Sequence, residues 1–132
     1  MENKVPGKDV VEDDLISKFP LVSNQGNRDL KSVIEVAGTR FGDNTIPIIA
    51  GPNTVEGKEM ILETAKAVKE YGGSFLRAGA FKPLTFPYRS EKYYELREEG
   101  LEYLSEAREQ VGIPVVSEVM HVDKVELISS VV

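Results

Sequence analysis

Residues 46–85 read IPIIAGPNTVEGKEMILETAKAVKEYGGSFLRAGAFKPLT, and this stretch decides the fold. Two apolar runs, residues 46–50 and 75–80, each end in a polar cluster. Residues 56–71 between them have the apolar spacing of one amphipathic helix. This order predicts a βαβ unit with its functional groups at the carboxyl ends of the strands, where parallel α/β folds place their ligands.

The rest of the chain leads into this unit or repeats it. Residues 94–111 predict a second helix, residues 114–120 predict a third strand, and a short third helix is expected from Val122 onward. Upstream, residues 32–37 and 39–41 predict a β-hairpin. Because strands and helices alternate, we expect an α/β fold with a parallel sheet and right-handed crossovers.

Local signals sharpen this interpretation at a few positions. Residues 46–50 form a continuous apolar run, which is typical of a strand buried on both faces of a parallel sheet, with Pro47 near its start. Thr54 is predicted to be the N-cap of the first helix. Gly100 either divides the second helix or marks a close contact.

Length and composition limit the class of protein. The 132 residues fit one domain, and we predict an irregular arm over residues 1–30 followed by a single domain over residues 31–132. The formal net charge of −6 argues against a general affinity for nucleic acid or anionic membranes. The absence of cysteine excludes disulfides, thiolate metal sites and cysteine nucleophiles. Because no apolar run approaches the ~18 residues of a membrane span, a cytoplasmic protein is expected.

Polar residues at the predicted strand ends are candidates for a functional site, and each has a structural alternative. Arg77 could bind a ligand or could pair with Glu56 or Glu118. Asn53 could be a functional residue or could simply shape a turn. His121, the only histidine, could act as a general base or could lie at the start of the third helix without a catalytic part.

Three segments carry a resemblance to a known family: IIAGPNTVE at residues 48–56, LRAGAFKPLT at residues 76–85 and VSEVM at residues 116–120. In this order and spacing they resemble the first three βα units of the DAHP synthases of the short bacterial and archaeal type. The related KDO-8-phosphate synthases share this pattern. The similarity runs from about Ser32 to Val132. It implies a (β/α)8 TIM barrel, which typically needs ~250 residues, so we expect a partial barrel of about three βα units preceded by the hairpin.

The resemblance also implies an activity and assigns roles to residues. The family condenses phosphoenolpyruvate with an aldose phosphate, erythrose 4-phosphate in the DAHP synthases, in the shikimate pathway of aromatic amino acid biosynthesis. By this resemblance Arg77 and Lys82 bind phosphoenolpyruvate, and Lys82 is the catalytic residue that passes a proton to the reacting centre. Thr85 corresponds to a hydroxyl that holds the aldose phosphate, and Glu118 to an acidic residue at the end of the third strand. A guanidinium fork and an ammonium group suit a substrate of high negative charge.

Two positions depart from the family pattern. Asn53 stands where metal-dependent members have a cysteine ligand, and a carboxamide is a poor substitute for a thiolate. Metal-independent KDO-8-phosphate synthases carry asparagine there, so we expect no metal cofactor and count Asn53 among the substrate-binding residues. Leu84 replaces an arginine that grips erythrose 4-phosphate in DAHP synthases. Losing such a charge-assisted bond costs about 1.5–3 kcal/mol, which leaves the identity of the aldose phosphate open.

The family's other ligands lie on strands that follow the third βα unit. The chain alone is therefore expected to be incomplete for catalysis, as a fragment or as a half-barrel completed by a second copy of itself or by another polypeptide. A different class of function is also open: a non-catalytic relic or regulatory module that keeps the phosphate pocket or binds a partner at an open sheet edge.

Overall fold

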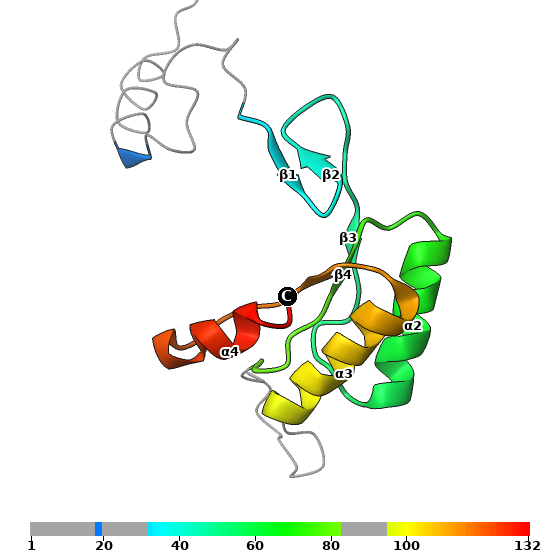
Figure 1. The fold of residues 1–132 in the computed structure, drawn as a ribbon, viewed down its shortest axis with the longest axis vertical. Coiled ribbons are helices and arrows are strands. Elements are labelled where there is room, and N and C mark those ends of the chain that lie inside the picture. The colour runs from blue at the N-terminus through cyan, green and yellow to red at the C-terminus, as the bar shows by residue number, and fades with distance from the viewer. Residues whose placement is uncertain (1–17, 20–31, 83–94) are drawn as a thin grey trace, which may run out of the picture. The chain divides into compact units, whose positions relative to one another are not determined.

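The computed structural model describes residues 18–19, 32–82 and 95–132 (Figure 1). By its internal contacts the chain divides into two units, Met1–Ile46 and Pro47–Val132. Most of the predicted N-terminal arm lies outside the described residues, and so does the stretch that contains Leu84 and Thr85. Among the residues that are described, no helix has the length and apolar character needed to cross a bilayer.

The first unit contains the predicted hairpin. β1 (Ile34–Val36) and β2 (Thr39–Phe41) pair antiparallel, which confirms the prediction. Ala37 and Gly38 connect them, and both have a positive φ, 49° and 75°. Positive φ at both central residues is the geometry of a two-residue type I′ turn, whose twist matches that of the two strands.

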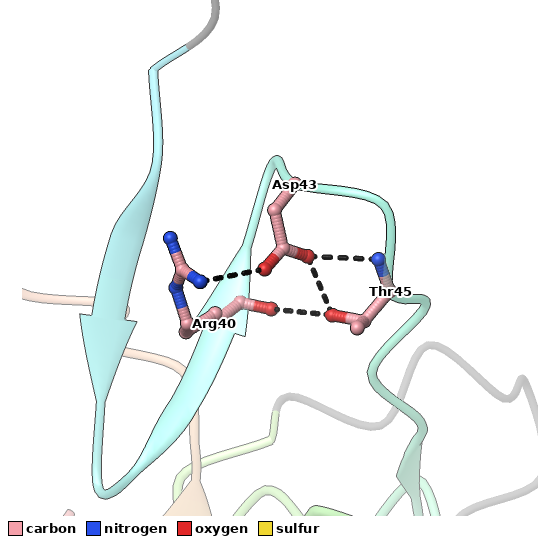
Figure 2. Close-up of polar contacts among 3 residues, drawn as sticks. All are labelled: Arg40, Asp43 and Thr45. Atoms are coloured by element: carbon pink, nitrogen blue, oxygen red, sulfur yellow. Dashed lines mark hydrogen bonds and ion pairs between the residues drawn. The ribbon is translucent and has the colours of Figure 1, made fainter.

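A turn built around Asp43 follows β2 (Figure 2). Oδ1 of Asp43 accepts hydrogen bonds from the Thr45 hydroxyl at 2.6 Å and from the Thr45 backbone N–H at 2.8 Å. Nη1 of Arg40 lies 3.5 Å from Oδ2 of the same carboxylate. The Thr45 hydroxyl, then the Thr45 N–H, and to a smaller extent Arg40 hold the pKa of Asp43 below its ordinary value, because all three stabilise the charged carboxylate.

The second unit is the βα region (Figure 1). Its described residues form a parallel sheet of three short strands in the order β3–β4–β5, spanning Ile49–Ala50, Phe75–Arg77 and Val115–Val116. Its helices are α2 (Lys58–Glu70), α3 (Arg97–Val111) and the short α4 (Val125–Ser129), which a 3-10 turn, η2 (Val122–Lys124), precedes. The helices α2 and α3 pack side by side. The predicted alternation of strand and helix is confirmed.

The core of this unit lies where α2, α3 and α4 meet the sheet. Its fully buried large side chains are Val55, Ile61, Leu76, Leu104 and Ile128. Burying one such side chain stabilises the fold by roughly 1.5–3 kcal/mol. The periodic positions Ile61 and Leu104 thus face inward as the helical spacing predicts.

Gly100 marks a close contact and does not divide its helix. α3 continues through this position, and Gly100 is buried against the chain at the end of β4. A Cβ at Gly100 would lie 3.2 Å from the Cβ of Ala80. The backbone N–H of Arg97, the first residue of α3, donates to the carbonyl oxygen of Ala80 at 2.9 Å. The start of α3 is therefore held against the segment that follows β4.

The predicted N-cap is wrong. Gly57 occupies the N-cap of α2 without any side-chain cap bond. Thr54 is instead buried and forms a parallel bridge with Gly79, because the pairing of β3 with β4 continues beyond the last residue of β3. The backbone N–H of Val55 donates to the Gly79 carbonyl, and the Gly79 N–H donates to the Asn53 carbonyl. Because the backbone as far as Val55 is engaged in these strand-type hydrogen bonds, α2 begins only at Lys58.

The predicted burial of residues 46–50 is also wrong. The side chains of Ile46, Ile48 and Ile49 are 90%, 54% and 44% exposed. Within the described residues β3 pairs with β4 alone, so it is an edge strand and one of its sides is open. The strands are also shorter than predicted, since the regular ladder of β4 ends at Arg77 and that of β5 at Val116.

Candidate functional site

The carboxyl ends of the three parallel strands bring four of the predicted site residues together. They come from the segments after β3, β4 and β5 and are Asn53, Arg77, Lys82 and Glu118. Thr85, the fifth predicted residue, lies outside the described residues. The convergence follows from topology, because the carboxyl ends of parallel strands share one side of the sheet.

Arg77 is the last residue of β4, and its guanidinium reaches across to the segment after β3. Nη1 donates to Oδ1 of Asn53 at 3.0 Å and lies 3.5 Å from the carbonyl oxygen of Pro52. The alternative pairing of Arg77 with Glu56 or Glu118 is therefore wrong. Asn53 has a definite structural part here, since it orients the guanidinium.

Gly51 allows this approach of the two strand ends. Its φ is +146°, and a Cβ there would lie 2.2 Å from the carbonyl oxygen of Arg77. No side chain fits at that distance, so glycine is required for the backbone of β3 to pass the end of β4.

Lys82 and Glu118 form an ion pair between the segments that follow β4 and β5. Nζ of Lys82 lies 2.8 Å from Oε1 of Glu118, and it donates a hydrogen bond to Oε2 at 3.0 Å. The two side chains are 25% and 30% exposed. The pair is thus partly shielded from solvent, and the ammonium already has a negative partner.

Unpaired polar atoms gather at the same strand ends. In the part of the chain that the structure describes, Oγ1 of Thr54, Oγ of Ser117 and Oε1 of Glu118 are buried side-chain atoms without a hydrogen-bond partner. Oε1 is closer to Lys82 than Oε2 is, yet only Oε2 has hydrogen-bond geometry. Buried polar groups are normally paired. Oε1 already has Lys82 as its ionic partner, so the hydroxyls of Thr54 and Ser117 are the buried groups left for water or a ligand to pair.

Gly79 lies at the centre of the site, and the sequence analysis did not single it out. A Cβ on Gly79 would lie 2.9 Å from Oε1 of Glu118, 3.1 Å from the carbonyl oxygen of Asn53 and 3.1 Å from Cβ of Lys82. The signal in the sequence was a glycine inside an apolar run, which often marks a close backbone approach.

His121 is not part of this convergence. It is exposed, occupies the N-cap of η2 and lines a separate cleft of about 280 Å³ together with Phe81 and Lys124. The cations of that cleft have carboxylate partners, because Lys124 donates to Glu98 at 3.1 Å and Arg97 donates to Glu95 at 3.1 Å. A hydrogen bond from the backbone N–H of Glu98, followed by Lys124, lowers the pKa of Glu98.

The described residues do not supply a metal centre. No group of three or more histidine, cysteine, aspartate or glutamate side chains in residues 32–82 and 95–132 could hold an ion. The amide oxygen of Asn53, the donor at the family's ligand position, is occupied by Arg77.

Comparisons with known proteins identify the relatives of this chain. The model of the DAHP synthetase I family matches residues 23–132. A phospho-2-dehydro-3-deoxyheptonate aldolase of Thermotoga maritima is 40% identical over 109 residues, which cover 83% of this chain and 31% of the relative. A 2-dehydro-3-deoxyphosphooctonate aldolase of Ralstonia pickettii is 31% identical over 94 residues, covering 68% of this chain and 33% of the relative. The chain spans about a third of the length of these relatives.

Solved structures agree with the sequence matches. The crystal structure of the Thermotoga maritima enzyme, a DAHP synthase, superposes with a TM-score of 0.66 at 38% identity, covering 76% of this chain and 27% of that one. A truncated form of the DAHP synthase from the same organism gives a TM-score of 0.61 at 36% identity, covering 76% and 33%. The prediction of an α/β partial barrel is confirmed, and the match over residues 23–132 shows that this chain belongs to the DAHP synthetase I family.

Proposed function

We propose that this chain carries the phosphoenolpyruvate-binding part of a transferase of the DAHP synthase type. Such an enzyme condenses phosphoenolpyruvate with an aldose phosphate. The observation that carries the proposal is that two cations lie at the carboxyl ends of the strands: Arg77 ends β4 and contacts Asn53, and Lys82 follows it and pairs with Glu118. Relatives that share the fold act on 3-deoxy sugar acids of seven and eight carbons, as their names state.

The two cations suit the two anionic groups of phosphoenolpyruvate. Nη1 of Arg77 is directed at Asn53 and Pro52, and no bond within the described residues engages Nε or Nη2, which suits bidentate contact with phosphate or carboxylate. Lys82 has three N–H groups and directs one at Glu118, so two can reach a substrate. The substrate therefore meets an Arg77 that Asn53 holds in place and a Lys82 that it must share with Glu118.

The reaction proceeds in three bond changes. The C2–C3 π electrons of phosphoenolpyruvate form a bond from C3 to the aldehyde carbon, and the aldehyde oxygen takes a proton. Water adds to the cationic C2 and releases a proton. The bond from C2 to the phosphate oxygen then breaks while the C2 hydroxyl gives its proton to the departing phosphate, which leaves a ketone and inorganic phosphate. We assign the proton given to the aldehyde oxygen to Lys82, with Glu118 close enough to return a proton to the amine.

We further propose that this site works without a metal at Asn53. A neutral carboxamide is a weak ligand for the divalent metals that thiolate and imidazole sites select, and its oxygen already accepts from Arg77. Condensation by the assembled protein should then survive a chelator. Loss of activity in chelator that returns with manganese or zinc would contradict this assignment.

A second candidate function is a non-catalytic module that binds a phosphorylated ligand. The observation in its favour is the short length, since the chain spans about a third of the relatives it matches. Binding needs only the strand ends described here, whereas turnover needs groups from further βα units. The synthase and the non-catalytic module both bind phosphoenolpyruvate, but only the synthase turns it over. Both proposals assume a cytoplasmic protein.

The test measures phosphate release and ligand binding in parallel. Phosphoenolpyruvate is supplied with erythrose 4-phosphate or with a five-carbon aldose phosphate. The chain is assayed alone and mixed with a polypeptide carrying the part of the Thermotoga relative that this chain does not cover. We expect phosphate release in the mixture and a loss of about 100-fold or more in Lys82→Ala, the range for a general acid.

The matched control is Lys66→Ala, a change at an exposed lysine of α2 away from the strand ends. It should leave both binding and turnover unchanged. Binding of phosphoenolpyruvate without phosphate release in any mixture would support the module. A chain that binds no phosphoenolpyruvate would refute both candidates.

A further inference from the structure

The hydroxyl of Thr54 has no part in the chemistry assigned above. Thr54 is 7% exposed, and in the part of the chain that the structure describes its Oγ1 is buried without a hydrogen-bond partner. It does not cap α2 either, because Gly57 occupies that position. A buried hydroxyl that stays unpaired destabilises a protein, so we expect a second state in which this hydroxyl is bonded.

Thr54 lies on the face of the sheet that carries the candidate site. Its bridge partner is Gly79, and paired residues of neighbouring strands have their side chains on the same face. Ala78, the residue before Gly79, is buried in the core, so position 79 faces away from the helices. A Cβ at Gly79 would lie 2.9 Å from Oε1 of Glu118 and 3.1 Å from Cβ of Lys82. Thr54 therefore shares a face with this ion pair.

Oε1 of Glu118 complements the Thr54 hydroxyl. It too is buried, and although Nζ of Lys82 lies 2.8 Å away, Oε1 has no hydrogen bond. A carboxylate oxygen can only accept, and a hydroxyl can donate. Neighbouring strands lie about 4.8 Å apart, so the two atoms belong to adjacent positions on one face. Because the Glu118 side chain has several torsions, its carboxylate can move toward Thr54 without a change in the backbone.

Ser117 does not offer the same contact, although its Oγ is also buried and unpaired. Val116 pairs with Arg77, whose guanidinium is at the candidate site. Side chains alternate along an extended segment, so Ser117 faces the helices while Glu118 faces the site. Among the described residues, Thr54 therefore supplies the buried, unpaired hydroxyl on the face of the site.

We propose that Thr54 is a positioning residue that holds Glu118 when phosphoenolpyruvate draws Lys82 away. This inference rests on the proposed function. In the structure the ammonium of Lys82 holds the carboxylate of Glu118 by charge. When an anionic group of the substrate takes a share of that ammonium, Oε1 accepts a hydrogen bond from the Thr54 hydroxyl instead. The new bond pairs two buried polar atoms and keeps the carboxylate in place beside Lys82.

An isosteric substitution separates this role from a structural one. Thr54→Val keeps the shape and removes the hydroxyl, and calorimetric titration measures the binding of phosphoenolpyruvate. We expect about tenfold weaker binding, because a hydrogen bond to a charged group is lost in the bound state only. Thr54→Ser keeps the hydroxyl and should restore the binding. Without phosphoenolpyruvate, Thr54→Val should unfold at the same or a higher urea concentration, since the hydroxyl has no partner to lose.

A double-mutant cycle shows whether Thr54 acts through Glu118. Glu118→Met removes the acceptor, and in that background Thr54→Val should change the binding little, because the two substitutions remove the same interaction. The matched control is Thr64→Val. The Thr64 hydroxyl donates to the carbonyl of Met60 within α2, away from the strand ends, so its loss should leave the binding of phosphoenolpyruvate unchanged.

Equal binding by the unmodified chain and by Thr54→Val would overturn the inference and leave the proposed function standing. A loss of affinity that persists in the Glu118→Met background would also overturn it. So would a Thr54→Val chain that is less stable without phosphoenolpyruvate, since the hydroxyl would then already be bonded. No binding by the unmodified chain would refute the phosphoenolpyruvate site itself, and this inference with it.

Discussion

Lys82 and Glu118 form an ion pair between the segments after β4 and β5, with Nζ 2.8 Å from Oε1 and 3.0 Å from Oε2. The ion pair places a carboxylate beside the ammonium group of Lys82, which we propose binds the anionic substrate. Phosphoenolpyruvate must therefore share Lys82 with Glu118, and the carboxylate opposes binding of the anion while it holds the ammonium in position.

Replacing the carboxylate should strengthen binding of phosphoenolpyruvate. Glu118→Gln keeps the shape and removes the negative charge, and we expect about fivefold tighter binding, or ~1 kcal/mol for a partly exposed pair. Calorimetric titration measures it. Glu106→Gln is the control, since that carboxylate pairs with Lys58 on the helices α2 and α3. Weaker binding in Glu118→Gln would show that Glu118 itself positions the substrate.

Gly79 should not tolerate a side chain. In Gly79→Ala the new Cβ would lie 2.9 Å from Oε1 of Glu118 and 3.1 Å from two further atoms, so we expect a loss of about 1–3 kcal/mol in the free energy of unfolding. Urea denaturation checks this. Gly57→Ala has nothing within 4 Å of its Cβ and should change stability far less. Equal effects of both substitutions would contradict the close approach at Gly79.

Arg97 is in the left-handed region, with φ 52°, at the first position of α3. A left-handed conformation costs a residue with a Cβ roughly 1–2 kcal/mol. Arg97→Gly should therefore raise the free energy of unfolding by about 1 kcal/mol, because the Arg97 side chain is 64% exposed and its ion pair with Glu95 contributes little. Glu109→Gly, later in the same helix, should instead lower it by ~1 kcal/mol. Destabilisation by both would exclude strain at Arg97.

The Asp43 turn predicts a pH dependence in the first unit. The pKa of Asp43 is lower in the folded chain than in the unfolded chain, chiefly because the Thr45 hydroxyl donates to it. Its contribution to stability is thus complete above the ordinary value of 3.8 and is lost as pH falls through the lowered value. NMR titration of the carboxyl checks this, and Thr45→Val should move the pKa back up. An unchanged pKa in that variant would contradict the leading part of the hydroxyl and assign the shift to the backbone N–H of residue 45 and to Arg40.

The order of the elements was predictable because helical periodicity is a local property. Ile61 and Leu104 recur with the spacing that buries one helix face, and both are fully buried. The position of a strand in its sheet is not local. The apolar run before Gly51 has the composition of a central strand, but β3 pairs only with β4 among the described residues, and the sequence does not state how many neighbours a strand has.

The candidate site divides in the same way. Arg77 and Lys82 were predictable from their motif, because strand ends of a parallel sheet are where such groups act. Their partners, Asn53 and Glu118, follow other strands. They reach the two cations only because the neighbouring segments pack closely around Gly79 in the folded chain. Thr54 looked like a helix cap because its type suits one, and strand pairing overrode that preference.

Calorimetric titration of phosphoenolpyruvate into the unmodified chain and into Arg77→Ala tests the central claim most directly. Removal of a charge-assisted contact of about 1.5–3 kcal/mol should weaken binding roughly 10- to 100-fold. Arg108→Ala, which loses a bond to the carbonyl of Val131 away from the strand ends, should bind as the unmodified chain does. Measurable binding that is lost in Arg77→Ala alone is the predicted result. No heat with the unmodified chain, or equal affinity in all three proteins, would contradict a phosphoenolpyruvate site at these strand ends.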